Sequence, residues 1–311
     1  MNGTRGGSDP LHPPVPPISS RDEPRFRDRE RKSALAAAFQ EQGEDYDRLR
    51  PGYPGVALDA MLAPMPMPMP MPMPMPMPMP VPVPVPVPVG EAGGVVRAID
   101  LGAGTGKLSW ALADRGLSVT AVDTSPAMLA TARRRRAETM PPRAPMLTTH
   151  LAPAEATGLP AGSAELVTVA QAWHWFDAAA ASAEVARLLV PGGVLALVWN
   201  MLDVTIPWVH RLSRIMHAGD IHREDFLPTV GPELELTERS MHQWEDPMPT
   251  QDVIDLARTR SYVITAPEER RAKVLANLDW YLHEHLGHAR GELVGVPYRT
   301  DLFLYRVVEQ G

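Results

Sequence analysis

Cysteine is absent from the 311-residue chain, and lysine is scarce, occurring only at positions 32, 107 and 273. A chain without thiols cannot form disulfides, bind zinc through thiolates or use a cysteine nucleophile. Lys and Arg total 30 against 37 Asp and Glu, which gives a formal net charge of −7. Because no basic surplus is available to attract a polyanion, we expect no nucleic-acid partner.

Long apolar runs are also missing. No segment approaches the ~20 apolar residues that a membrane-spanning helix needs, and the first twenty residues lack the apolar core of a secretory signal. His217, His222, His283, His285 and His288 follow no spacing typical of a zinc site, so no metal site is predicted. These absences favour a cytoplasmic protein that acts without a membrane.

Proline is abundant, and its distribution divides the chain. Residues 1–24 are rich in Gly, Pro and Ser and predict a disordered tail, whereas residues 25–63 predict leader helices. In residues 64–90, Met or Val alternates with Pro. Since proline has no N–H and pushes the preceding residue out of the α region, this stretch predicts a low-complexity insertion without helix or central strand. Residues 91–200 form the predicted core, and residues 201–311 a helical cap with the last strands of the sheet.

An apolar strand that ends in Asp100 and breaks into a glycine-rich turn is the strongest local pattern. Residues 95–106 read VVRAIDLGAGTG, with glycines at 102, 104 and 106. Glycine has no Cβ, so it adopts positive φ and leaves room where a side chain would collide with a ligand. A helix predicted over residues 105–115 places unpaired N–H groups beside this turn, which suits a carboxylate or phosphate.

Strands and helices continue to alternate along the chain. Apolar strands are predicted at residues 118–123, 147–152, 165–170 and 194–199. Asp123 ends the first of these beside the glycine turn, where an acid can accept both hydroxyls of a ribose. This acid could instead cap the next helix, a position that Thr124 or Ser125 also fits. The alternation predicts an α/β fold with a parallel sheet.

Several motifs then occur in a fixed order. Residues 100–106, DLGAGTG, are tighter than the G-x-G-x-x-G of dinucleotide sites and resemble motif I of class I S-adenosylmethionine-dependent methyltransferases. Residues 171–177, QAWHWFD, resemble a signature of a small-molecule branch of that family, similar to trans-aconitate and quinone-biosynthesis methyltransferases. The Y-x-x-x-R-P-x-Y-P pattern of residues 46–54 resembles the leader of this branch. Residues 189–193, LVPGG, resemble a further family motif, whose two glycines are expected to end a helix in the left-handed region.

The resemblance implies a Rossmann-like three-layer sandwich, with a mostly parallel seven-stranded sheet that ends in an antiparallel hairpin, plus a helical cap. It also implies S-adenosyl-L-methionine as the cofactor. The residues that it places against this cofactor are Asp100, Gly102, Ala103, Gly104, Gly106, Asp123, Thr124, Ala154, Glu155 and Gln171. Pro153 stands where the family often has an Asp or Asn for the adenine amine, and Glu155 also fits a solvated loop acid.

The resemblance further implies transfer of a methyl group to a small-molecule acceptor by in-line displacement. In this branch the leader folds over the cofactor, and Tyr46, Arg50 and Trp173 are expected to contact the substrate. His174 is the candidate base, since its unperturbed pKa of ~6.5 suits a proton near neutrality. The same residue also fits a structural histidine at a strand end.

Two other functions share much of this pattern. A non-catalytic sensor or scaffold that binds S-adenosylmethionine would keep the same binding residues. An NAD(P)-dependent oxidoreductase would use the same strand–helix–strand unit, but it would need the longer glycine spacing, and the chain lacks an evident Tyr-x-x-x-Lys relay. The sequence leaves the acceptor and the oligomeric state open.

Overall fold

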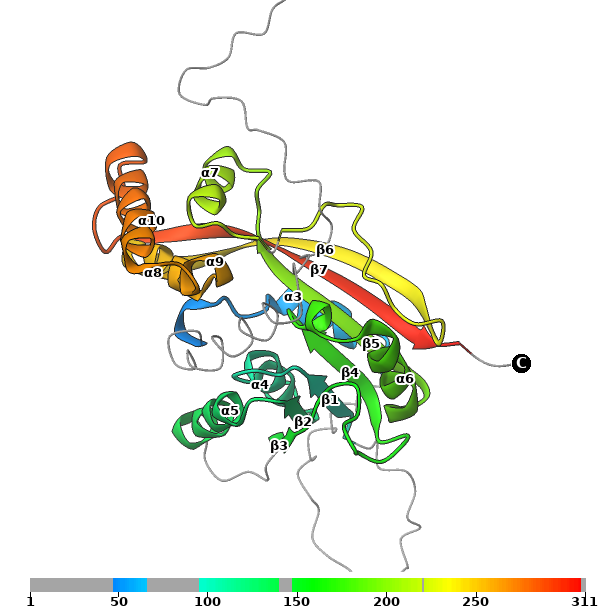
Figure 1. Cartoon of the computed structure of the whole chain (residues 1–311). Helices are drawn as coiled ribbons and strands as arrows, with labels where there is room; N and C mark the ends of the chain where they lie inside the picture. Colours follow the sequence, from blue (N-terminus) through cyan, green and yellow to red (C-terminus); the bar gives the residue numbers. More distant parts are fainter. Residues whose placement is uncertain (1–46, 66–94, 140–146, 220, 309–311) are drawn as a thin grey trace, which may run out of the picture.

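The computed structural model describes residues 47–65, 95–139, 147–219 and 221–308. The predicted tail, the leader up to and including Tyr46, and residues 66–90 of the predicted insertion lie outside these ranges. The described part of the chain forms a β-sheet with helices on both faces and a group of helices at one end (Figure 1).

The sheet has seven strands in the order β3-β2-β1-β4-β5-β7-β6. The parallel strands are β1 (Arg97–Leu101), β2 (Ser118–Asp123), β3 (Leu147–Leu151), β4 (Ala164–Ala170) and β5 (Leu189–Leu202). The antiparallel strands are β6 (Leu234–Pro249) and β7 (Leu293–Val307), with β7 between β5 and β6. This order confirms the predicted sheet and its antiparallel end.

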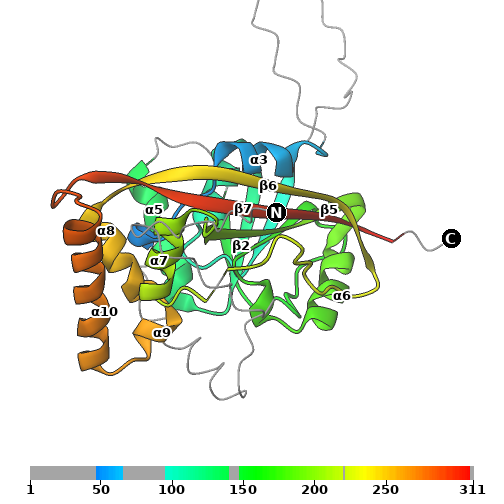
Figure 2. The same ribbon diagram turned by 90° about the horizontal axis from the view of Figure 1, so that it is seen from above.

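Helices cover both faces of the sheet. On one face lie α3 (Gly55–Leu62), α4 (Lys107–Ala113) and α5 (Pro126–Thr139), and on the other lies α6 (Ala178–Leu188). Figure 2 shows α3 along β6 and β7, at the opposite side of the sheet from α6. Because strands buried on both faces need mostly apolar side chains, the mostly apolar β4 and the apolar run 194–199 of β5 suit the middle of this three-layer fold.

The cap is built by the chain after β5. It contains α7 (Pro207–Ile215), α8 (Thr250–Asp255), η2 (Leu256–Thr259), α9 (Ser261–Ile264) and α10 (Glu268–Trp280), which continues into a π-helical turn at Tyr281–His285. These helices gather at one end of β6 and β7 (Figure 1). A buried apolar cluster joins them to Leu49, Leu202 and Tyr298. The cap is therefore packed on the end of the sheet where β5 finishes.

The LVPGG segment differs from its prediction. α6 ends at Leu188, and β5 begins at Leu189, so the glycines lie inside a strand rather than at a helix end. Ala164 pairs with Leu189 while Leu166 pairs with Val194, which makes residues 190–193 a bulge. Gly192 is left-handed with φ +77°, but Gly193 is not. Gly193 is instead required by close approach, since a Cβ there would lie 3.0 Å from the carbonyl oxygen of Val190.

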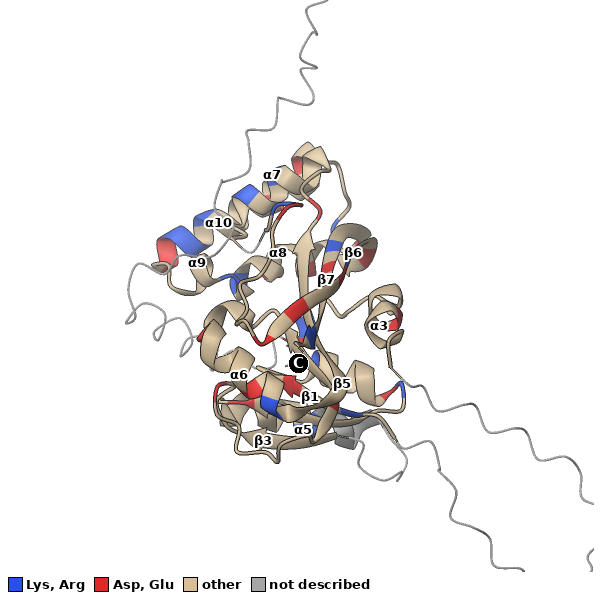
Figure 3. Ribbon diagram, turned by 90° about the vertical axis from the view of Figure 1, so that its right-hand side faces the viewer, with Lys and Arg blue, Asp and Glu red and all other residues tan. Residues whose placement is uncertain are grey.

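No helix among the described residues is long and apolar enough to cross a lipid bilayer. Figure 3 shows basic and acidic residues interspersed over the ribbon of the sheet and the cap. α10 illustrates the mixture, because Glu268 and Glu269 open the helix and are followed by Arg270, Arg271 and Lys273.

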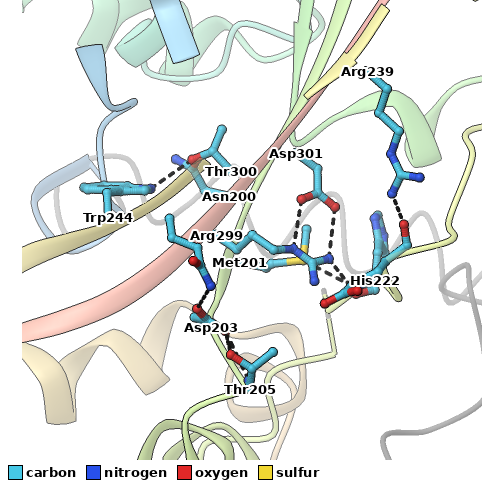
Figure 4. A network of polar contacts seen from close by, with 12 residues as sticks. Asn200, Met201, Asp203, Thr205, His222, Arg239, Trp244, Arg299, Thr300 and Asp301 are labelled. Atoms are coloured by element: carbon cyan, nitrogen blue, oxygen red, sulfur yellow. Dashed lines mark hydrogen bonds and ion pairs between the residues drawn. The ribbon is translucent and has the colours of Figure 1, made fainter. Parts of the chain in front are cut away.

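A buried ion pair joins two residues of β7. Arg299 donates from Nε to Oδ1 of Asp301 at 2.8 Å and from Nη2 to Oδ2 at 3.0 Å. Nη2 also donates to the main-chain oxygen of His222 at 2.8 Å (Figure 4). The side chains are 9% and 0% exposed. Each charge therefore depends on the other for compensation, because little water reaches either group.

We expect Asp301→Leu to lower the free energy of unfolding by about 3–5 kcal/mol, because it leaves the Arg299 charge buried without its partner. The double variant Arg299→Met/Asp301→Leu should recover most of this loss, since no buried charge remains. Urea unfolding of the three proteins measures both effects. A single variant as stable as the wild type would contradict this account of the pair.

Candidate functional site

The turn after β1 has three left-handed glycines with different surroundings. Gly102, Gly104 and Gly106 have φ of +66°, +55° and +79°. A Cβ on Gly102 would lie 2.6 Å from Cβ of Ala172, and a Cβ on Gly106 would lie 2.9 Å from Cβ of Ala132. A Cβ on Gly104 would have no described atom within 4 Å. The outer glycines are thus required by the protein's own packing, whereas the middle one leaves bare main chain beside open space.

Asp123 at the end of β2 fixes the middle of this turn. Its Oδ2 accepts from the Gly104 N–H at 2.9 Å, and its Oδ1 accepts from the Ser125 N–H at 2.7 Å. Burial raises the pKa of Asp123 above its ordinary value. The helix cap belongs to Ser125, whose Oγ accepts from the Met128 N–H at 3.3 Å. Asp123 is therefore oriented toward the glycine turn rather than used to cap α5.

Asp100 lies beneath the turn, fully buried. Its Oδ2 accepts from the Ser109 hydroxyl at 2.6 Å and its Oδ1 from the Thr168 hydroxyl at 2.8 Å. Burial raises the pKa of this carboxyl to about 6. The two hydroxyls bind Asp100 to α4 and β4, which favours a role in supporting the turn. A direct contact between Asp100 and a cofactor stays a prediction.

The ends of β2 and β3 complete this edge of the sheet. Thr124 is exposed, and the Ala103 N–H donates to the main-chain oxygen of Val122 at 3.0 Å. Ala154 is buried after β3. Glu155 accepts from the Asp177 N–H at 2.9 Å. Glu155 is therefore bonded to the start of α6. The sequence suggested either a contact with adenine or a solvated loop acid for Glu155, and neither included this bond.

Gln171 and Trp173 follow β4, and the side chains of both donate hydrogen bonds to main-chain oxygens of other segments. Gln171 has φ +57°, rare for a residue other than glycine, and its Nε2 donates to the main-chain oxygen of Asn200 at 2.5 Å. Trp173 is buried, and its indole N–H donates to the main-chain oxygen of Thr229 at 2.8 Å. The structure thus favours packing over the expected substrate contact for Trp173, because its polar atom is engaged inside the fold.

His174 follows Trp173 in the short helix η1 (Trp173–Trp175). Its ring is half-buried, with its centroid 5.1 Å from that of Trp175. In a parallel sheet the carboxyl ends of the strands meet at one edge, so His174 lies at the same edge as the glycine turn and Asp123. Its use as a base stays a prediction.

The leader contacts both the glycine turn and the cap. Asp47 accepts from the Thr105 hydroxyl at 2.8 Å, and its Oδ1 lies 3.8 Å from Nζ of Lys107. Arg50 donates from Nη2 to the main-chain oxygen of Thr259 in η2 at 2.9 Å. The leader therefore lies against the turn, and one of the predicted substrate residues, Arg50, holds it to the cap. Tyr46 lies outside the described residues.

Sequence reasoning missed two residues of this edge. Asn200, at the end of β5, donates from Nδ2 to the main-chain oxygen of Gly52 in the leader at 2.6 Å. Asp47 contacts the turn as described above. The available signal for Asn200 was a polar residue directly after the apolar run 194–199 within β5, the same pattern that identified Asp123 at the end of β2.

Comparison with known proteins agrees with this geometry. A family model described as a methyltransferase domain matches residues 99–197. An uncharacterized methyltransferase of Mycobacterium tuberculosis is 36% identical over 256 residues, which cover 82% of this chain and 89% of the relative. The chain belongs to the class I methyltransferase family.

Other relatives support the same family. An uncharacterized methyltransferase-like protein of Schizosaccharomyces pombe is 30% identical to this methyltransferase over 188 residues, which cover 58% of the chain and 70% of the relative. A solved structure from Anaeromyxobacter dehalogenans, provisionally named a type II methyltransferase, is 28% identical with a TM-score of 0.54. The match covers 69% of this chain and 91% of the Anaeromyxobacter chain. The structural likeness therefore spans about two thirds of this chain.

Alanine substitutions at Gly102 and Gly104 test whether a side chain meets packed atoms at the first position and open space at the second. Gly102→Ala should cost about 2–4 kcal/mol of unfolding free energy, because left-handed strain adds to the collision with Ala172. Gly104→Ala should cost only about 1–2 kcal/mol, since strain acts there without a collision. Chemical denaturation compares the two methyltransferase variants. Equal losses would contradict the assignment of open space to Gly104.

Asp100 makes stability depend on pH in a defined direction. Its pKa is about 6 in the folded state against 3.8 for the ordinary carboxyl, so the folded state binds more protons between these values. The free energy of unfolding should therefore fall as the pH rises from about 4 to about 6, by roughly 3 kcal/mol from this group. Asp100→Asn should flatten the curve over that window. Parallel curves for the two proteins would contradict the prediction.

Proposed function

We propose that the chain is a cytoplasmic enzyme that transfers a methyl group from S-adenosyl-L-methionine to a small-molecule acceptor. One observation carries the proposal: bare main chain at Gly104 borders open space and is bonded directly to the Asp123 carboxylate. The family membership supports methyl transfer, and the site's chemistry supports this donor.

The residues present fit the donor. The Asp123 carboxylate accepts from the main-chain N–H groups of Gly104, Thr124 and Ser125, and we propose that its oxygens also accept from the two hydroxyls of a ribose. Gly104 leaves space beside its main chain for the amino-acid portion. Ala154 follows β3 at the same edge, and we propose that an adenine ring lies beside this part of the chain. These features suit a nucleoside with a charged amino-acid tail.

The chain's own contribution is to hold the reactants and exclude water. When bound, S-adenosyl-L-methionine supplies a methyl group on a positively charged sulfur. The leader contacts the turn through Asp47 and Thr105, and we propose that it limits the access of water to this edge when the donor is bound. Orientation of this kind can supply up to ~7–11 kcal/mol in favourable cases. His174, at the end of β4, is the residue that we propose takes a proton from the acceptor.

A small acceptor is favoured over a macromolecule. The net charge is −7, and both signs are mixed over the described ribbon, so a basic face for nucleic acid has no support (Figure 3). The cap covers the end of β5 through a buried apolar cluster, which places a packed wall beside the edge that carries His174. We propose that this wall, which includes residues of α7 to α10, selects the acceptor.

Binding and turnover should separate Asp123 from His174. Asp123→Ala should weaken binding of S-adenosylhomocysteine by roughly 10–100-fold, because hydrogen bonds to a charged group are lost. His174→Ala should bind it within about threefold of the wild type yet lose roughly 10²–10⁴ of the methylation rate. Calorimetric titration measures binding, and a methyl-tritiated donor with a panel of small acceptors measures turnover.

Asp59→Ala is the matched control, because Asp59 is an exposed acid of α3. It should change neither quantity. Equal affinities of the Asp123 and His174 variants would contradict the assigned roles. Tight binding of S-adenosylhomocysteine by the wild type, without methylation of any acceptor, would favour a sensor or scaffold over an enzyme.

A further inference from the structure

Asn200 joins four parts of the structure at the functional edge of the sheet. It is buried at 4% exposure. Its Nδ2 donates to the leader at Gly52, its Oδ1 accepts from the Thr300 hydroxyl of β7 at 2.6 Å, and its main-chain oxygen accepts from Gln171 after β4. Both polar side-chain atoms of Asn200, together with its main-chain oxygen, are therefore engaged within the protein.

The donor and acceptor in each hydrogen bond between Thr300, Asn200 and Gly52 follow from the Trp244 contact on the neighbouring strand. The Trp244 indole N–H of β6 points to the Thr300 hydroxyl at 2.9 Å (Figure 4). An indole N–H can only donate, so the Thr300 oxygen is the acceptor and its proton is left for Asn200. The Asn200 amide must then turn its oxygen to Thr300 and its NH₂ group to Gly52. A flipped amide would set its oxygen against the Gly52 carbonyl, which can only accept, and would lose that contact.

Described polar contacts join the leader to the glycine turn, to the cap and, through Asn200, to the central strand β5. Its last part, α3, also packs along β6 and β7. Asp47 bonds to the glycine turn through Thr105, and Arg50 bonds to the cap at Thr259. Gly52 bonds to Asn200 at the end of β5. Because β5 belongs to the buried centre of the sheet, this contact gives the leader a rigid reference point.

The same residue also fixes the strained end of β4. Gln171 holds φ +57°, a conformation that costs energy and persists only where the surroundings impose it. Its main-chain N–H donates to Val198 at 2.9 Å and its side chain donates to Asn200. Asn200 of β5 thus bonds both to the leader and to Gln171, which begins the segment that carries His174.

We propose that Asn200 is a positioning residue, which holds the leader over the glycine turn at a set distance from the end of β4. Its effect on ligand binding rests on the proposed function. A leader that is already in place does not have to be ordered when the methyl donor binds, and this saving strengthens binding. Losing the Nδ2 contact should release the leader without unfolding the sheet.

Three variants test the direction of the network. Asn200→Asp is nearly the same shape and still accepts from Thr300, but it presents an oxygen to the Gly52 carbonyl. Thr300→Val keeps the shape of residue 300 and removes the hydroxyl that orients the amide. Thr300→Ser is the matched control, because it keeps the hydroxyl and removes only a methyl group. A role in packing alone would make serine the worse replacement.

The rate of tryptic cleavage at the Arg48–Leu49 bond measures how often the leader leaves its site in the full-length protein without ligand. Arg48 is half-exposed, but Leu49 is only 1% exposed, so cleavage requires the leader to leave its site. Asn200→Asp and Thr300→Val should be cut about 5–10-fold faster than the wild type, as expected for one lost hydrogen bond, and Thr300→Ser should match it. Circular dichroism should show a folded sheet in all four proteins.

Titration with S-adenosylhomocysteine is the second readout. The Asn200→Asp and Thr300→Val variants should bind it about 5–10-fold more weakly, and Thr300→Ser should bind as the wild type does. Equal cleavage rates in all four proteins, or a serine variant worse than the valine variant, would overturn the proposal. A wild type that does not bind S-adenosylhomocysteine would refute the proposed function, while the cleavage rates would still decide the role of Asn200.

Discussion

The arrangement of the functional edge of the sheet depends on the glycine turn after β1, which has no room for a side chain at two of its positions. Gly102 and Gly106 pack against Ala172 and Ala132 so closely that a Cβ at either would collide. The Asp123 carboxylate then binds the N–H of Gly104 between them. These constraints fix the turn relative to β2 and β4, and they leave the Gly104 main chain beside open space. Contacts within the protein therefore form the functional edge without a bound ligand.

Two layers of polar contacts hold that turn. Beneath it, the buried Asp100 carboxylate binds hydroxyls from α4 and β4. Above it, the leader reaches Thr105 through Asp47 and β5 through Gly52. Burying a carboxylate is unfavourable unless hydrogen bonds compensate, which is why hydroxyl donors surround Asp100. The protein thus accepts an electrostatic cost in the sheet to keep the turn in one conformation.

Local patterns were sufficient to predict most of the sheet. The strands β1, β2 and β4 are short and mostly apolar, and each of β1 to β5 was recognised, at least in part, from its own sequence. Asp123 was placed beside the turn because parallel strands end at one edge. The bulge at residues 190–193 was missed, since Gly192 and Gly193 also suit a helix end, and only pairing with β4 distinguishes the two.

Contacts between distant segments were not predictable in this way. Trp173 donates to Thr229 and Arg50 to Thr259, and neither acceptor lies in a segment whose sequence marks it as a partner. The substrate roles expected for these side chains came from neighbouring motifs, whereas their polar atoms are engaged by main-chain oxygens of later segments. Asn200 is similar, because its importance comes from Gly52 and Thr300, which lie 148 and 100 residues away in the sequence.

The central claim is that Asp123 and the Gly104 main chain bind the methyl donor. A crystal structure of the chain with S-adenosylhomocysteine tests it most directly. The account predicts the ribose hydroxyls within hydrogen-bond distance of the Asp123 carboxylate and the amino-acid tail beside Gly104. A ligand bound elsewhere on the chain, with Asp123 still bonded only to main-chain N–H groups, would contradict it.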